Sequence, residues 1–187
     1  MEVNGYKVKP NANLTDANLK GADLKGALLT DAILMDANLT GASLEGANLT
    51  DADLTGANLT RANLCDAILT GANLADADLK GAILVNAYLV LAKLTRADLT
   101  GASLEGANLT DADLTYSDLT DADLTNANLK GAKLTDADLE GANLKGANLK
   151  GADLTRANLY NAILTGANLY GAKLENKDRD TTGFLYL

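Results

Sequence analysis

The sequence lacks most of the side chains that carry catalytic chemistry. Its 187 residues include no histidine and no tryptophan, and only one cysteine, one proline and one phenylalanine. The absence of histidine excludes Ser-His-Asp and Cys-His nucleophile systems and histidine-bound zinc. The single Cys65 cannot form an internal disulfide, and no histidine or evident base accompanies it. We therefore predict that the protein is not an enzyme.

Long apolar runs and excess positive charge are also missing. No stretch of 18 apolar residues could span a membrane, and no early segment looks like a secretory signal. The formal net charge is −9, from 25 acidic and 16 basic residues. Contacts with nucleic-acid phosphates require clustered lysine and arginine, so direct nucleic-acid binding is not expected. These features predict a cytoplasmic protein without a membrane anchor.

The sequence does contain an uninterrupted period of five residues. Leucine occupies every fifth position from Leu14 to Leu174, 33 times in all. Alanine precedes each leucine by two residues, and Ser117 is the one exception. The position two residues after leucine is glycine 15 times, aspartate 9 times and asparagine 4 times. One repeat therefore reads Ala-(Asn/Asp)-Leu-(Thr/Lys/Glu)-(Gly/Asp).

This period fits neither a helix nor a flat strand. On a helix, successive leucines would be displaced by about 140°, and in a strand an odd step alternates faces. A short extended piece followed by a corner does fit, because alanine and leucine then point the same way. Glycine, aspartate and asparagine tolerate the corner conformation. The pattern predicts a polygonal coil with alanine and leucine inside.

The number of sides per coil stays open at this stage. Residues 40–55 recur identically at residues 100–115, and the offset of 60 suits three coils of 20 residues or four coils of 15. A small alanine beside each leucine favours the square, because four of each fill a narrow interior. A square predicts about eight coils stacked about 4.8 Å apart, a rod about 40 Å long.

The repeat, as in the segment Ala52-Asp53-Leu54-Thr55-Gly56, resembles that of the pentapeptide-repeat proteins, and the match covers residues 12–176. The resemblance implies an all-β, right-handed quadrilateral β-helix. We assign this solenoid to residues 11–176, an N-terminal cap strand to residues 1–10, and a C-terminal cap or dimer tail to residues 177–187.

The two flanks differ from the repeat. Tyr6 and Val8 lie two residues apart before Pro10 and suggest a short capping strand. The C-terminal flank either covers the last coil or forms a homodimer contact. The resemblance supports the second interpretation, since terminal coils dimerise in quinolone-resistance members of the family. The candidate residues for this cap or dimer contact are Phe184, Leu185, Tyr186 and Leu187.

One group of outward positions departs from the polar pattern. It comprises Ile83, Val85, Tyr88, Val90 and Leu91. A coil of 20 residues would also align Leu28 and Ile68 with Tyr88 as a stripe that Asn48 interrupts. Contiguous exposed apolar surface usually marks a contact site, although scattered surface residues are the alternative. A lesser group near the C-terminal end comprises Tyr160, Ile163 and Tyr170.

A second candidate surface is acidic. Asp78, Asp98, Asp118 and Asp138 are spaced by 20 residues and would form a ladder with steps of about 4.8 Å. Neighbouring charges at that spacing repel by about 1 kcal/mol in water, which a solvated face tolerates. The ladder could instead imitate a row of DNA phosphates. Calcium requires oxygens that converge from several directions, so we expect no metal site and no cofactor.

These features predict a non-catalytic scaffold or protein–protein interaction module with an unidentified protein partner. The alternative, which the resemblance implies, is a DNA mimic that binds a type II topoisomerase (gyrase) as quinolone-resistance members do. A 40 Å length of duplex carries about 24 phosphate charges, far more than the net −9 of this chain. Those inhibitors also often have phenylalanine where this sequence has leucine.

Overall fold

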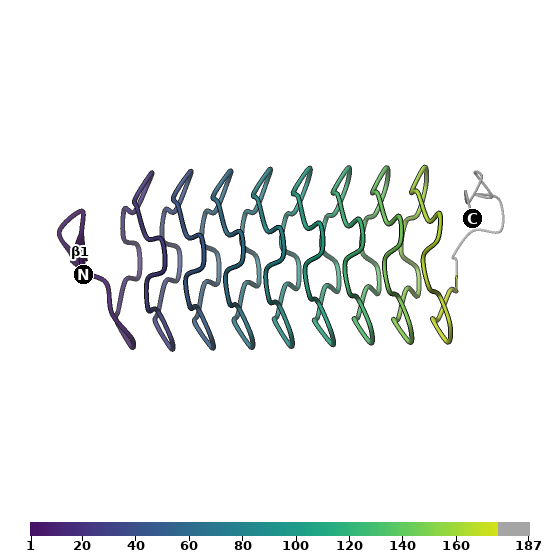
Figure 1. Ribbon diagram of the computed structural model, residues 1–187, viewed down its shortest axis with the longest axis horizontal. Helices are drawn as coiled ribbons and strands as arrows, with labels where there is room; N and C mark the ends of the chain where they lie inside the picture. Colours follow the sequence, from purple (N-terminus) through teal and green to yellow (C-terminus); the bar gives the residue numbers. More distant parts are fainter. Residues whose placement is uncertain (176–187) are drawn as a thin grey trace.

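The computed structural model describes residues 1–175, which form a rod of stacked coils (Figure 1). Parallel bridges join each residue before a leucine to the residue 20 positions later, from Asn13↔Ile33 to Asp153↔Lys173. One coil therefore holds four repeats, and the protein is a right-handed quadrilateral β-helix. The structure confirms the predicted all-β fold and decides for the square coil over the triangular one.

Each repeat supplies one side and one corner. At the corner, the N–H of the next alanine donates to the C=O of the preceding leucine, as from Ala17 to Leu14 at 3.0 Å. The second of the two residues between them has a positive φ, which is 56° at Asp16 and 63° at Gly21 in the next corner. Glycine adopts this conformation without strain, and aspartate and asparagine do so more readily than other residues. This requirement explains the residues found at the fifth position.

Backbone hydrogen bonds hold consecutive coils together. On the side that contains Leu34, the N–H of Leu34 donates to the C=O of Asp53 at 2.6 Å, and the N–H of Asp53 donates to the C=O of Ala32 at 2.9 Å. The N–H of the corner residue Asp36 donates to the C=O of Thr55 at 3.0 Å. The same three bonds recur along the rod, so each inner coil is bonded on both edges.

Alanine and leucine fill the interior as predicted. Every repeat leucine from Leu14 to Leu154 is buried. Ser117 is also buried, and its hydroxyl donates to the C=O of Leu114 at 2.7 Å. Burial decreases at the far end, where Leu169 is half-buried and Leu174 is exposed.

The N-terminal segment is a hairpin and not the single capping strand that the sequence suggested. Strand β1 (Glu2–Val3) pairs antiparallel with β2 (Tyr6–Lys7). Asn4 and Gly5 form the turn with φ values of 51° and 82°, as a two-residue type I′ turn requires. Val8 follows the hairpin and is buried against the first coil.

The hairpin replaces the missing coil above Asn18. In inner coils, the corresponding N–H and C=O groups bond to the backbone of the preceding coil. Here the N–H of Asn18 donates to the hydroxyl of Tyr6 at 3.2 Å, and the side-chain amide of Asn4 donates to the C=O of Asn18 at 3.2 Å. Two side chains thus satisfy both backbone groups on this side of the open end.

The limits assigned to the three segments stay predictions, because residues 177–187 lie outside the described residues. Within residues 1–175, no helix is long and apolar enough to cross a lipid bilayer.

Candidate functional site

Two opposite sides of the rod differ in charge. We call them the Asp98 side and the Tyr88 side, after one outward residue on each. The outward residues before leucine on the Asp98 side are four aspartates and four asparagines, at positions 18, 38, 58, 78, 98, 118, 138 and 158. On the Tyr88 side, no acidic residue occupies the outward positions before or after leucine. The net negative charge therefore lies on the other three sides and at the corners.

The Tyr88 side carries part of the predicted apolar surface. Bridges place Ile68 directly beside Tyr88, whereas Asn48 separates Leu28 from Ile68. The side chain of Tyr88 is 52% exposed and Ile68 is 37% exposed. Val90 follows Tyr88 on the same side and is half-buried. The predicted stripe is thus a pair of neighbours with Leu28 two coils away.

Two other members of the predicted cluster lie on the adjacent side of the rod. Ile83 bridges to Asn63 and Ser103, which places Ile83 and the following Val85 on the adjacent side. The corner residue Asn86 separates them from Tyr88. We use the name apolar patch for the surface on these two sides and the corner after Val90, which comprises Ile68, Ile83, Val85, Tyr88, Val90 and Leu91.

Leu91 occupies a corner and has a left-handed backbone conformation. Its φ is 60°, and its side chain is 59% exposed. A bulky residue in this region costs about 1–2 kcal/mol, because its Cβ crowds the following carbonyl oxygen. The exposed leucine side chain gains little burial to offset that cost. Among residues 1–175, the same left-handed conformation occurs at Arg61, Arg96, Tyr116 and Arg156, and Leu91 is the one aliphatic residue that adopts it.

Replacing Leu91 with asparagine is expected to raise the melting temperature by about 2–4 °C, since about 1 kcal/mol of strain is relieved. The reciprocal change, Asn86→Leu, introduces leucine at the preceding corner, where φ is 56°, and should lower the melting temperature by a similar amount. Differential scanning calorimetry measures both. A lower melting temperature for Leu91→Asn would show that the side chain stabilises the rod and is not strained.

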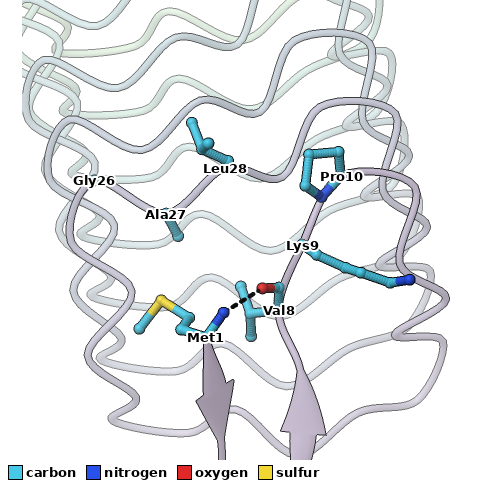
Figure 2. A pocket seen from close by; sticks show the side chains of 7 residues that line it. All are labelled: Met1, Val8, Lys9, Pro10, Gly26, Ala27 and Leu28. Carbon is cyan, nitrogen blue, oxygen red and sulfur yellow. Dashed lines mark hydrogen bonds between the residues drawn. The ribbon is translucent and has the colours of Figure 1, made fainter.

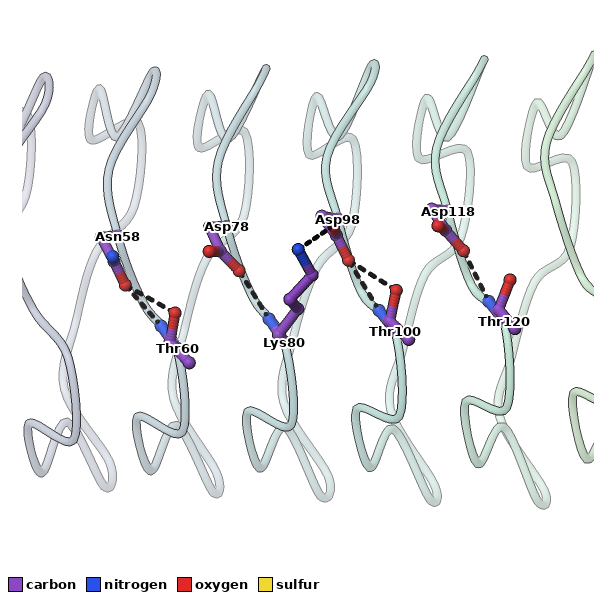
Figure 3. A network of polar contacts seen from close by, with 8 residues as sticks. All are labelled: Asn58, Thr60, Asp78, Lys80, Asp98, Thr100, Asp118 and Thr120. Carbon is purple, nitrogen blue, oxygen red and sulfur yellow. Dashed lines mark hydrogen bonds and ion pairs between the residues drawn. The ribbon is translucent and has the colours of Figure 1, made fainter.

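The acidic ladder lies in register, but its carboxylates are bound to the chain (Figure 3). Each Oδ1 accepts the backbone N–H two residues later, at 3.1 Å for Asp78, 3.1 Å for Asp98, 2.9 Å for Asp118 and 3.0 Å for Asp138. The carboxylates therefore follow the backbone and do not converge. Within residues 1–175, no group of three histidine, cysteine, aspartate or glutamate side chains could hold a metal ion.

Lysine further neutralises the ladder. The ammonium of Lys80 lies 2.7 Å from Oδ2 of Asp98. Partial burial raises the pKa of Asp98, but the bonds from Lys80 and Thr100 outweigh it, so the net pKa lies below its usual value. The pKa of Lys80 is raised, mainly by its hydrogen bond to Asp98. The ladder is less negative than four free carboxylates would be.

The sequence analysis missed a set of ion pairs along one corner of the rod. The guanidinium of Arg96 donates two hydrogen bonds to Asp76, both at 2.6 Å, and Arg156 contacts Asp136 in the same way. The hydrogen bond from Arg96 lowers the pKa of Asp76. An acid and an arginine 20 residues apart at corner positions were the available signal. Because of these ion pairs, the surface differs further from a continuous row of negative charges.

Two candidates remain, the thiol of Cys65 and the C-terminal cap or dimer contact. Cys65 is half-buried, and burial raises the pKa of its thiol, which makes it less reactive at neutral pH. The predicted cap or dimer residues Phe184, Leu185, Tyr186 and Leu187 lie outside the described residues.

Comparison with known proteins assigns the family. The model of pentapeptide repeats matches residues 10–31, 32–71, 72–111, 107–146 and 137–176. No curated protein matches the chain. Among solved structures, HetL of the cyanobacterium Nostoc, a pentapeptide repeat protein involved in heterocyst differentiation regulation, is 37% identical. The match covers 89% of this chain and 84% of HetL, with a TM-score of 0.43.

A second similar structure is a trypsin-treated form of QnrB1, a plasmid-mediated fluoroquinolone resistance protein. It is 22% identical, the match covers 90% of this chain and 92% of QnrB1, and the TM-score is 0.60. At this identity the likeness concerns the fold alone. The repeat, the coil geometry and the match over most of the chain lead to one conclusion: this protein is a member of the pentapeptide-repeat family.

Proposed function

We propose that the protein is a non-catalytic scaffold that binds a protein partner through the apolar patch. The observation that carries this proposal is the exposed pair Ile68 and Tyr88, which lie side by side in consecutive coils, with the exposed Leu91 at the following corner. Apolar surface gathered in this way usually marks a contact site. A rigid coil stack, bonded on both edges, fixes the backbone of the patch, so little backbone freedom is lost on binding.

The surroundings of the patch favour an apolar contact over a charged one. The Tyr88 side has no acidic outward residues, so a partner can approach without desolvating a carboxylate there. Tyrosine suits such an interface, because it buries a large ring and keeps a hydroxyl for a hydrogen bond. Tyr88 is therefore the residue that we expect to contribute most to binding.

The double substitution Tyr88→Ser and Leu91→Asn is expected to abolish capture of the partner from native extract. The residues are outward, so the variant should keep the melting temperature of the wild type or exceed it. Quantitative mass spectrometry of proteins retained by each bait provides the measurement. The matched control is the double substitution Tyr160→Ser and Tyr170→Ser, which changes two exposed tyrosines near the C-terminal end of the rod.

In this experiment at least one protein should be retained by the wild type and the control but lost by the patch variant. If the folded patch variant retains every protein that the wild type retains, the apolar patch is not the binding site.

The alternative function, a DNA mimic that binds a type II topoisomerase, has weaker support. The in-register aspartates on the Asp98 side favour it. Lysine and arginine contacts to the aspartates oppose it, as does a net charge of −9 against about 24 phosphate charges on duplex of the same length.

A further inference from the structure

The hairpin covers only part of the N-terminal end of the rod. On the two sides that follow Asn18, the outward residues of the first coil are Asp23 and Leu28. Among residues 1–175, no group bonds to the backbone N–H or C=O of either residue. One coil later, both groups of the equivalent Asn48 bond to the first coil, at 2.9 Å to Ala27 and 2.7 Å to Leu29. The first coil thus presents an unpaired β edge at Asp23 and Leu28.

An apolar hollow lies beside this edge (Figure 2). It has a volume of about 300 Å³, and its lining includes Met1, Val8, Pro10, Ala27 and Leu28. Leu28 is 60% exposed, although it stands at the position that asparagine or aspartate occupies in most other repeats. Unpaired backbone next to an apolar hollow is the arrangement that accepts an added strand, with hydrogen bonds from the main chain and a side chain in the hollow.

The chain itself contains a segment suited to this edge. Gly183-Phe184-Leu185 has a small residue two positions before leucine, as each Ala-X-Leu side of the coil does, and Leu187 follows two positions later. A strand with this pattern could direct Gly183 and Leu185 toward the rod axis, as the first coil directs Ala27 and Leu29. Its backbone would then meet the free groups of Leu28.

This segment cannot come from the same molecule. The described chain ends at the opposite end of the rod from the hairpin (Figure 1). A little over eight coils separate the ends by about 40 Å, and the 12 residues 176–187 span at most about 40 Å when fully extended. Gly183 lies only eight residues beyond the last described residue and reaches at most about 28 Å from it, so Gly183-Phe184-Leu185 of the same molecule cannot pair with the edge. The occupant must therefore belong to a second copy.

We propose that residues 183–187 of one copy add as a strand to the Leu28 edge of a second copy and place an apolar side chain in the hollow. The contact joins the C-terminal end of one rod to the N-terminal end of the next. Such a head-to-tail contact does not close, so it produces chains of rods that lengthen with concentration. The proposal does not depend on the apolar patch or on its partner.

The test measures the molar mass in solution by sedimentation as a function of protein concentration. The wild type should grow beyond a dimer as concentration rises. Leu28→Asp keeps the tail but has a defective edge. A chain truncated after residue 180 keeps the edge but lacks the tail. Each variant alone should therefore be a monomer. An equimolar mixture of the two should form a dimer and nothing larger, because only one productive contact remains.

Asn108→Asp is the matched control, since it places the same charge on the same side but away from the end, and it should associate as the wild type does. Circular dichroism verifies that each variant is folded. If truncation disturbs the last coil, a synthetic peptide of residues 176–187 replaces it and should reduce wild-type association.

Two results would overturn the proposal. If Leu28→Asp still forms dimers, the tails pair with each other in the two-fold arrangement that the family resemblance implied. If the wild type stays a monomer at millimolar concentration, the tail does not join copies.

Discussion

Leu94→Ala is expected to lower the free energy of unfolding by about 3 kcal/mol. Leu94 is fully buried, and its backbone N–H donates to the C=O of Asp113 at 2.7 Å. Hydrogen bonds hold the coils on either side at a set spacing, so the walls cannot collapse into the cavity that alanine leaves. The cost should therefore include the cavity as well as the lost burial. Urea unfolding followed by circular dichroism measures this value.

Leu169→Ala is the matched control for this substitution. Leu169 occupies the same position of the repeat but is half-buried in the last described coil. Its replacement should cost about 1 kcal/mol, because less apolar surface is lost and the end of the rod can adjust. Equal costs at the two positions would contradict a rigid central interior.

Deletion of residues 91–110 is expected to leave a folded rod that is one coil shorter. Val90 then joins Asp111, and this junction preserves the order of residue types across the corner. The N–H of Leu89, which donates to the C=O of Asn108 in the full chain, meets the equivalent Asn128. Each coil contacts mainly its neighbours, so the remaining coils keep their interactions. Small-angle X-ray scattering should show a rod about 4.8 Å shorter, with an unchanged circular dichroism spectrum.

Deletion of residues 91–112, only two residues more, should have a very different result. Val90 then joins Asp113, and no corner residue remains between the sides of Leu89 and Leu114. The two halves cannot stack in register, and about 5 kcal/mol or more is lost as leucines at the junction become exposed. We expect two separate unfolding transitions. If both deletions unfold with the same midpoint, the 20-residue register is not what joins the coils.

The predicted corners and interior follow from rules that act on single repeats. An inward alanine and leucine two residues apart, followed by a residue that accepts positive φ, specify one side and one corner wherever they occur. Ser117 obeys the same rule, because its small side chain fits and its hydroxyl bonds to Leu114. Such local conditions are visible in the sequence without knowledge of the neighbouring coils.

Two local signals were present but not used. Asn4-Gly5 is a strong hairpin signal, and it would have added strand β1 to the predicted cap. An asparagine or aspartate two residues before threonine also recurs. In the structure, Oδ1 of Asp53 accepts both the N–H of Thr55, at 3.1 Å, and its hydroxyl, at 2.6 Å. The asparagine or aspartate before leucine therefore fixes the backbone conformation that leads into the corner.

By itself, the sequence determined that the chain turns a corner every fifth residue, that alanine and leucine face inward, and that histidine-dependent catalysis is excluded. Only the tertiary structure decided which outward residues become neighbours, because that depends on the number of sides in a coil. In the square coil, Ile68 lies beside Tyr88, Ile83 lies on the adjacent side, and Asp76 pairs with Arg96. The structure also located the unpaired edge at Leu28, since the hairpin bonds to Asn18 alone among the outward residues of the first coil.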